Sequence, residues 1–106
     1  MTKSVTSKNF EQTVLKSSSP TVIKFFAQWC GACKQMKPIF EELSTELTGK
    51  YQFFTVDIDE DRDLAVKHNV SSIPAFVFFK NGKEVGRAIG SMSKQDLKGK
   101  IESSLK

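Results

Sequence analysis

A strand pattern is followed by the start of a helix pattern in the stretch Thr21-Val22-Ile23-Lys24-Phe25-Phe26-Ala27-Gln28-Trp29-Cys30-Gly31-Ala32-Cys33. Residues 21–26 are rich in β-branched and aromatic side chains and follow Pro20, which predicts a buried strand. Lys24 is the one charged residue within that strand. Across residues 33–47 the apolar side chains recur at spacings of three and four, which predicts an amphipathic helix. Pro38 lies inside this pattern and should bend the helix rather than end it.

The segments on either side of this unit continue an alternating order. Residues 2–5 can form a first strand, and a short helix can follow with Ser7 as its cap. After the long helix, residues 51–58 predict another strand and residues 60–67 a short helix that opens with acidic side chains.

The last third of the chain predicts a hairpin and a closing helix. The apolar run 75–79 reads as a buried strand, and Asn81-Gly82 is typical of a tight turn that leads into a second strand at 84–89. Ser93 can cap the final helix. The order βαβαβα followed by ββα predicts an α/β fold, with a mixed central sheet and helices on both faces.

Composition narrows the class of protein. Of the 106 residues, 39% are hydrophobic and 26% are charged, so we expect residues 1–106 to form one domain with its own core. No apolar run approaches the roughly 20 residues of a membrane span, and residues 1–10 lack the apolar stretch of a secretory signal, so we expect a cytoplasmic protein without membrane association. The formal charge of +4 comes without an arginine cluster, which argues against nucleic-acid binding.

The two cysteines, Cys30 and Cys33, stand at the junction of the predicted strand and helix. A sulfur at a helix N-terminus faces unpaired N–H groups and the positive end of the helix dipole, which favours the reactive thiolate. Cys30 has this position. Cys33 lies one turn further along the same face, so the two sulfurs can approach each other. The pair is suited to disulfide exchange, in which Cys30 attacks a partner's disulfide and Cys33 releases the reduced partner.

The cysteine pair also fits two other roles. Tetrahedral zinc takes four ligands, and the cysteines together with His68, the single histidine, leave such a site one ligand short. Inert buried thiols are the second alternative, but the start of a helix beside Gly31 and Trp29 is a reactive position. A C-x-x-C motif beside a βαβ pattern favours redox chemistry over both, with no metal and no bound organic cofactor.

Six segments of the chain follow one another as they do in a known family: residues 22–34, Pro38, Val56-Asp57-Ile58-Asp59, Ile73-Pro74, Phe79-Lys80-Asn81-Gly82 and Ile89-Gly90. Through them the chain resembles the thioredoxin family over essentially its whole length. The resemblance implies the thioredoxin fold, a mixed five-stranded central sheet flanked by four helices. It also implies protein-disulfide reduction through the two cysteines.

The resemblance further implies a partner-binding rim around the cysteines. It gives Ile73-Pro74 a cis peptide bond beside the sulfurs, where Pro74 shapes a groove for a partner's extended chain. Taken alone, this proline would mark only the boundary of a strand. Trp29, Gly31 and Ala32 belong to the active-site segment itself. The remaining residues of the groove come from separate segments: Ile58, Ser72, Ile73, Ala75, Gly90 and Ser91.

The resemblance also carries expectations about partners. It implies a monomer that is reduced by thioredoxin reductase, an NADPH-dependent flavoenzyme, and that passes electrons to peroxidases, reductases and other oxidised proteins. Two alternatives stay open at this point. One is a thiol oxidase or disulfide isomerase of the same fold, and the other is a non-catalytic module that uses the groove for binding alone.

Three positions depart from the family in ways that bear on the chemistry. Ala32 stands where the family usually has Pro, and its N–H could donate to the Cys30 thiolate, which predicts a less reducing couple. Lys24 stands where the family usually has a buried Asp, and Thr55 replaces the Lys that often accompanies it. A buried Lys24 would have a lowered pKa and could act as a base when neutral or favour a thiolate when charged. A Lys24 that extends its ammonium to water would do neither. The sequence leaves both placements open.

Overall fold

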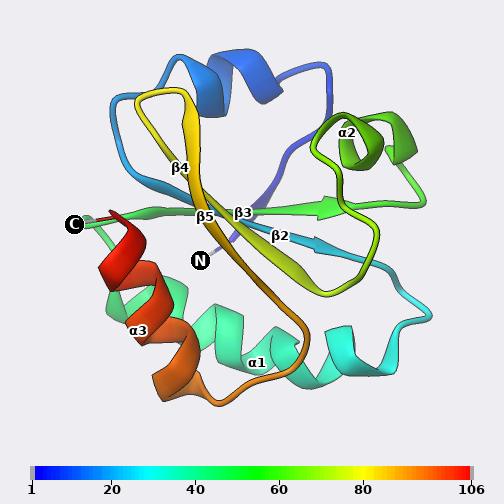
Figure 1. Cartoon of the computed structure of the whole chain (residues 1–106), viewed down its shortest axis with the longest axis vertical. Coiled ribbons are helices and arrows are strands. Elements are labelled where there is room, and N and C mark those ends of the chain that lie inside the picture. Colours follow the sequence, from blue (N-terminus) through cyan, green and yellow to red (C-terminus); the bar gives the residue numbers. More distant parts are fainter. Residues whose placement is uncertain (1, 106) are drawn as a thin grey trace.

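The central sheet has five strands in the order β1-β3-β2-β4-β5, as Figure 1 shows. The computed structural model describes residues 2–105. Strands β1, β3 and β2 run parallel, whereas β4 is antiparallel to β2 and β5 is antiparallel to β4. The mixed sheet predicted from the sequence is confirmed. The strands are β1 (Lys3–Ser4), β2 (Thr21–Phe26), β3 (Gln52–Asp57), β4 (Ala75–Lys80) and β5 (Lys83–Ile89).

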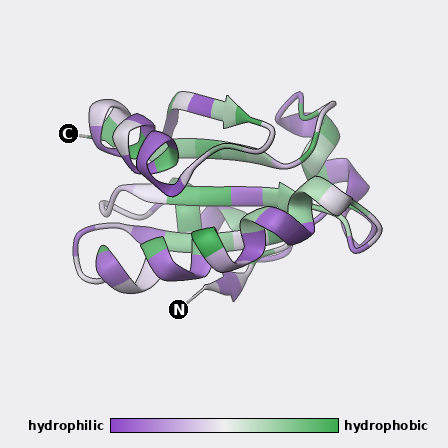
Figure 2. Cartoon of the chain, turned by 90° about the horizontal axis from the view of Figure 1, so that it is seen from below, coloured by the Kyte–Doolittle hydropathy of each residue, from purple (hydrophilic) through white to green (hydrophobic). Residues whose placement is uncertain are grey.

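Helices cover both faces of this sheet. The long helix α1 (Gly31–Glu46) and the last helix α3 (Lys94–Leu105) lie on one face (Figure 1). A turn of π-helix, η1 (Glu11–Leu15), and the short helix α2 (Arg62–Lys67) lie on the other. Helix α1 continues through Pro38 as predicted. Apolar and polar residues alternate along α1 and α3 in Figure 2, as expected of helices with one face against a sheet.

The predicted cap of the first helix is wrong. Ser7 does not cap η1, which follows Phe10 without a side-chain cap. Instead, the N–H and the hydroxyl of Ser7 both donate to Oδ2 of Asp61, at 2.6 and 2.7 Å. Asp61 is the cap of α2, because its Oδ1 accepts the N–H of Leu64 at 3.1 Å. Ser7 therefore joins the segment before η1 to the start of α2.

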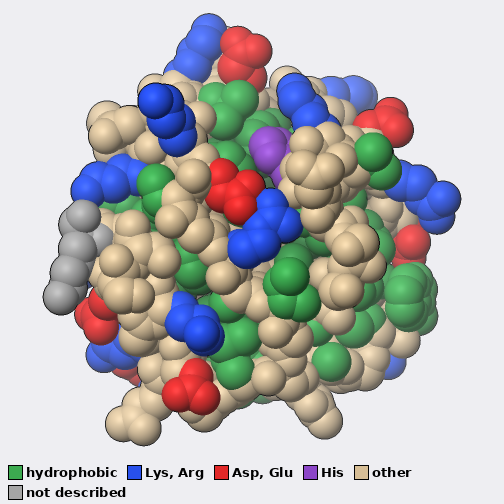
Figure 3. Space-filling model, in the orientation of Figure 1, with side chains coloured by type: hydrophobic (Ala, Val, Ile, Leu, Met, Phe, Trp, Pro, Cys, Tyr) green, Lys and Arg blue, Asp and Glu red, His purple; other side chains and the backbone are tan. Residues whose placement is uncertain are grey.

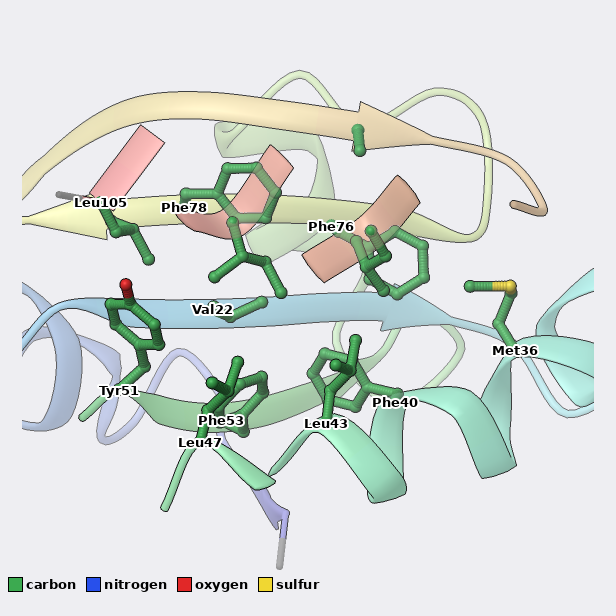
Figure 4. Close-up of a cluster of buried hydrophobic side chains, with 13 residues drawn as sticks. Val22, Met36, Phe40, Leu43, Leu47, Tyr51, Phe53, Phe76, Phe78 and Leu105 are labelled. Atoms are coloured by element: carbon green, nitrogen blue, oxygen red, sulfur yellow. The ribbon is translucent and has the colours of Figure 1, made fainter. Parts of the chain in front are cut away.

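The sheet is apolar on both faces because helices bury both of them. Figure 4 shows one cluster, in which Phe40 and Leu43 of α1 lie near Val22 of β2 and near Phe76 and Phe78 of β4. The rings of Phe40 and Phe76 are 5.8 Å apart between centroids. A second cluster packs η1 and α2 against the opposite face. Burial on both sides accounts for the continuous apolar runs of β2 and β4.

The hairpin between β4 and β5 has the predicted turn. Asn81 and Gly82 have φ angles of 53° and 79°, the left-handed backbone of a type I′ turn. At Gly82 a Cβ atom would lie 2.7 Å from the carbonyl oxygen of Leu15, so glycine is required both by conformation and by space. The turn thus packs directly on η1.

The outer surface carries mixed charge. On the face in Figure 3, lysines and arginines are interspersed with carboxylates. No helix within residues 2–105 is both long enough and apolar enough to cross a membrane.

Candidate active site

Several strand ends meet at one edge of the sheet, and this brings the predicted site residues together. Phe26, at the end of β2, pairs with Asp57 of β3, while Ala75, at the start of β4, pairs with Phe25 and with Ile89 of β5. The segments that leave β2, β3 and β5 therefore lie beside the segment that enters β4 (Figure 1). These segments carry the two cysteines, Ile58, Ile73-Pro74 and Gly90.

Cys30 is the N-cap residue of α1, with extended backbone angles. Its Sγ accepts a hydrogen bond from the N–H of Cys33 at 3.1 Å, so the sulfur takes the place that a serine or aspartate oxygen occupies in an ordinary cap. The predicted donor, the N–H of Ala32, is not the group that bonds to this sulfur. A cap side chain reaches the N–H two or three positions into the helix, and here it reaches the third. This hydrogen bond and the end of the helix dipole both favour negative charge on Cys30.

Cys33 lies behind Cys30 and is only 3% exposed. Both cysteines are free thiols. Burial raises the pKa of Cys33 to about 11, and a hydrogen bond between the Cys33 thiol and the side chain of Cys30 acts in the same direction. The positive charge of Lys24 lowers the pKa of Cys33 but does not offset these effects. Cys33 is therefore a protonated thiol at neutral pH.

The segment before β4 contacts the cysteine pair directly. The carbonyl oxygen of Ile73 lies 4.0 Å from Sγ of Cys30, and the Ile73-Pro74 peptide bond is cis, as the resemblance implied. The carbonyl of Pro74 accepts the N–H of Gly90 at 2.8 Å. Gly90 has a φ of +93°, a backbone conformation that favours glycine. This link holds the start of β4 to the end of β5 beside the sulfurs.

Trp29 is the most exposed large side chain of the site, at 68%. Its indole Nε1–H donates to Oδ2 of Asp59 at 2.8 Å, which fixes the ring at the rim of the cysteine pair. Asp59 has no role predicted from the sequence, where it only forms part of a segment that matches the family. The hydrogen bond spans the segments that follow β2 and β3, so no local pattern in the sequence could indicate it.

The other predicted groove residues differ in their surroundings. Ala32, Ile58 and Ile73 are partly buried and pack against the cysteines. Pro74 and Ala75 are buried at the start of β4. Gly31, Ser72 and Ser91 are exposed, and the hydroxyl of Ser91 donates to Oε1 of Gln35 at 3.4 Å. A Cβ atom at Gly31 would meet nothing within 4 Å, so the fold does not require glycine there.

Lys24 is buried, with only 4% of its surface exposed. Its Nζ lies 5.1 Å from the ring centroids of both Phe26 and Phe40, within the range of cation–π contacts. Burial lowers the pKa of Lys24, whereas the charges of Glu41 and Cys33 act in the opposite direction. Of the two placements that the sequence left open, the structure has the buried one. Lys24 is thus close enough to Cys33 for the charges of the two groups to interact.

The sequence model of the family described as Thioredoxin matches residues 1–103, which is nearly the whole chain. The chain belongs to the thioredoxin family. Thioredoxins are protein thiol–disulfide oxidoreductases, and the adjacent Cys30 and Cys33 provide the dithiol for this exchange.

Individual thioredoxins match over comparable lengths. The thioredoxin of Rickettsia felis is 37% identical over 105 residues, which cover 99% of this chain and 100% of the relative. The thioredoxin of Pseudomonas aeruginosa is 34% identical over 101 residues, covering 95% of this chain and 94% of the relative. A chloroplastic thioredoxin M-type of Pisum sativum is 36% identical over 98 residues, which cover 92% of this chain and 57% of that protein.

A pocket of about 350 Å³ lies beside the active site of this thioredoxin-family chain and has Cys33 in its wall. Sequence reasoning missed it, although one signal was present. Cys33, Lys37 and Glu41 are spaced four apart, which places them on one face of α1. The pocket lies where this face approaches Lys24 and Thr55, which are partners of each other across β2 and β3.

His68 lies away from the cysteines, at the end of α2. Its ring centroid is 4.8 Å from that of Phe10 and 5.5 Å from that of Phe79. Across residues 2–105 no three side chains of His, Cys, Asp or Glu gather as metal ligands would. The histidine that a zinc site would need is instead a packing residue on the opposite face of the sheet.

Proposed function

We propose that Cys30 is the attacking thiolate and Cys33 the resolving thiol in the reduction of disulfides in partner proteins. The observation that carries this assignment is the 3.1 Å hydrogen bond from the N–H of Cys33 to Sγ of Cys30. It gives one sulfur a donor that stabilises negative charge, while the other sulfur is buried and protonated. The two thiols therefore have different reactivities within one turn of helix.

The reaction has two exchange steps. In the first, the Cys30 thiolate attacks one sulfur of the partner's disulfide, a mixed disulfide forms, and the second partner sulfur leaves and takes up a proton. In the second, Cys33 loses its proton and attacks Sγ of Cys30. The Cys30–Cys33 disulfide forms, and the remaining partner sulfur leaves as a thiol. The partner gains two electrons and two protons, and this chain loses the same number when the proton that Cys30 releases on forming its thiolate is included.

The groove beside Cys30 is the proposed binding surface for the partner's chain. Ile73 presents its carbonyl 4.0 Å from the attacking sulfur, and Pro74 lacks an N–H, so a partner strand can approach this edge closely. Ile58 packs against the cysteines, and the exposed Trp29 directly precedes Cys30 in the chain. Ser72, Gly90 and Ser91 complete the surface, whereas Ala75, predicted as a groove residue, is buried at the start of β4. Gly31 and Ala32 connect the two cysteines, and Ala32 packs against them.

The finer expectations about partners extend the same proposal. Members of the thioredoxin family interact with thioredoxin reductase and with oxidised target proteins. For this chain we propose reduction by the NADPH-dependent flavoenzyme, delivery of electrons to peroxidases and reductases, and action as a monomer. The bacterial relatives support a cytoplasmic location.

The roles of the two cysteines can be separated by trapping. A Cys33→Ser variant lacks the resolving thiol and should accumulate mixed disulfides between Cys30 and partner proteins. Treatment with a reductant should break these disulfides and release the partners from the variant. A Cys30→Ser variant at the same concentration should trap at least tenfold less. Equal trapping by both variants would contradict the assignment of Cys30 as the attacking residue. Partners that stay bound after reduction would instead indicate a non-catalytic binding module.

A further inference from the structure

The pocket beside Cys33 contains more positive charge than its other side chains neutralise. Lys24 of β2 and Lys34 and Lys37 of α1 line it, against a single carboxylate, that of Glu41. One oxygen of that carboxylate already accepts the hydroxyl of Thr2, at 2.6 Å. None of the three ammonium groups has an ion pair or hydrogen bond to another residue in the 2–105 range. The carboxylate of Glu41 can balance only one of the three ammonium groups, so the pocket keeps an excess of positive charge.

Lys24 makes this imbalance costly. An ammonium group has three N–H donors, and a buried charge without acceptors is unfavourable. The rings of Phe26 and Phe40 contact the ammonium through their faces, but they accept no conventional hydrogen bond. Because the side chain is 4% exposed, bulk water cannot supply these acceptors freely. Whatever fills the pocket must present oxygen atoms to Nζ of Lys24.

We propose that this pocket binds a small oxyanion, such as inorganic phosphate or a small carboxylate. Such an anion supplies several acceptor oxygens at once and offsets the excess positive charge. A volume of about 350 Å³ accommodates a group of this size, together with water. Lys34 and Lys37 are exposed at the rim, where they attract the anion, and Lys24 contacts it at the base. Ordered water alone would satisfy the donors but would leave the excess charge.

The proposed site has a consequence for the thiol chemistry, and this consequence rests on the proposed function. Cys33 lines the same pocket, so the negative charge of a bound anion opposes ionisation of its thiol. Saturating phosphate should therefore slow the release of a partner from the mixed disulfide by at least about twofold, at constant ionic strength.

Binding is tested with inorganic phosphate on the full reduced chain, by amide chemical shifts in a ¹H–¹⁵N NMR titration in which sodium chloride keeps the ionic strength constant. The expected result is a saturable shift at residues 24, 33, 34 and 37. Lys24→Met should weaken phosphate binding by at least about tenfold, because charge-assisted hydrogen bonds are lost. Lys100→Met is the matched control, because Lys100 is an exposed lysine of α3 outside the pocket and its removal changes the net charge equally.

A second variant keeps the test decisive if Lys24→Met does not fold. Lys34→Gln combined with Lys37→Gln alters only exposed side chains and should weaken binding by about two- to fivefold. Chemical shifts that do not saturate, or a phosphate affinity that is unchanged in either variant, would overturn the proposal. They would indicate that phosphate only screens the lysine charges, or that water alone fills the pocket. The readout involves no disulfide exchange, so this proposal and the assignment of the cysteines can fail separately.

Discussion

Replacing Lys24 with Met tests how the active site controls its inner thiol. The buried charge of Lys24 lowers the pKa of Cys33, while burial and the hydrogen bond of its thiol with the Cys30 side chain raise it to about 11. At that value about one Cys33 in 10⁴ is a thiolate at pH 7, and about one in 10² at pH 9. Loss of the charge removes a cation that favours the thiolate, and the apolar Met side chain adds to the desolvation. Cys33 in the variant should therefore ionise even less readily.

The assay is the rate at which iodoacetamide alkylates Cys33 in a Cys30→Ser background, where it is the only thiol. Burial, the largest cause of the raised pKa, remains in this background. Without the Lys24 substitution, the rate should rise about tenfold for each pH unit between pH 7 and 9. Lys24→Met should slow it by about two- to tenfold throughout this range. Lys100→Met should leave it unchanged.

Two results would refute this reasoning. A rate that levels off below pH 9 would mean that burial does not raise the pKa of Cys33 as far as the structure indicates. An unchanged or faster rate in Lys24→Met would mean that the ammonium does not act on the thiol, despite its place in the same pocket.

Four further predictions test other parts of the structure. Ala32→Pro should make the Cys30–Cys33 couple more reducing, because it removes an N–H from the first turn of α1, and an unchanged potential would contradict this. Gly90→Ala should lower the free energy of unfolding in urea by about 1 kcal/mol or more, because φ is +93°, whereas a neutral effect would show that the backbone there adapts. Phe40→Ala should cost about 3–5 kcal/mol in the same assay, since the ring is fully buried against Phe53 and Phe76, and a loss below 1 kcal/mol would refute its place in the core. Burial lowers the pKa of His68 in the folded protein, so its contribution to the free energy of unfolding is fully present above pH 6.5, the ordinary pKa of histidine, and is lost as the pH falls below that value. His68→Phe should flatten this decline in stability, and an equal decline in both proteins would contradict the prediction.

Local patterns were sufficient for much of the fold. Strand β2 and helix α1 follow from a change in hydrophobic periodicity within residues 21–47. The turn at Asn81-Gly82 follows from the two residue types that adopt a left-handed backbone most readily, and both have positive φ in the structure. In contrast, the cis bond before Pro74 came only from resemblance to a family, because a proline at a strand boundary is ordinarily trans.

Two of the features that the sequence left open or predicted wrongly depend on tertiary contacts, and a third depends on local geometry. The buried placement of Lys24 brings its ammonium group against the ring of Phe40, which belongs to α1 on one face of the sheet. Ser7 binds Asp61, which lies 54 positions further along the chain, so its local sequence gave the wrong partner. The prediction that Cys30 lies at the start of the helix is correct, but the predicted donor to its sulfur is wrong. The orientation of the Cys30 side chain places Sγ at the N–H of Cys33 instead of the N–H of Ala32.

The reduction potential of the Cys30–Cys33 couple tests the central claim most directly. It can be measured by equilibration in graded thiol–disulfide buffers, with the fluorescence of Trp29, the single tryptophan, as the readout. A protein-disulfide reductase should give a strongly reducing value, near the approximately −270 mV of thioredoxin. A value between about −180 and −120 mV, as in disulfide isomerases and oxidases, would contradict the assignment as a reductant and would mean that Ala32 and Lys24 convert the site to the opposite direction of exchange.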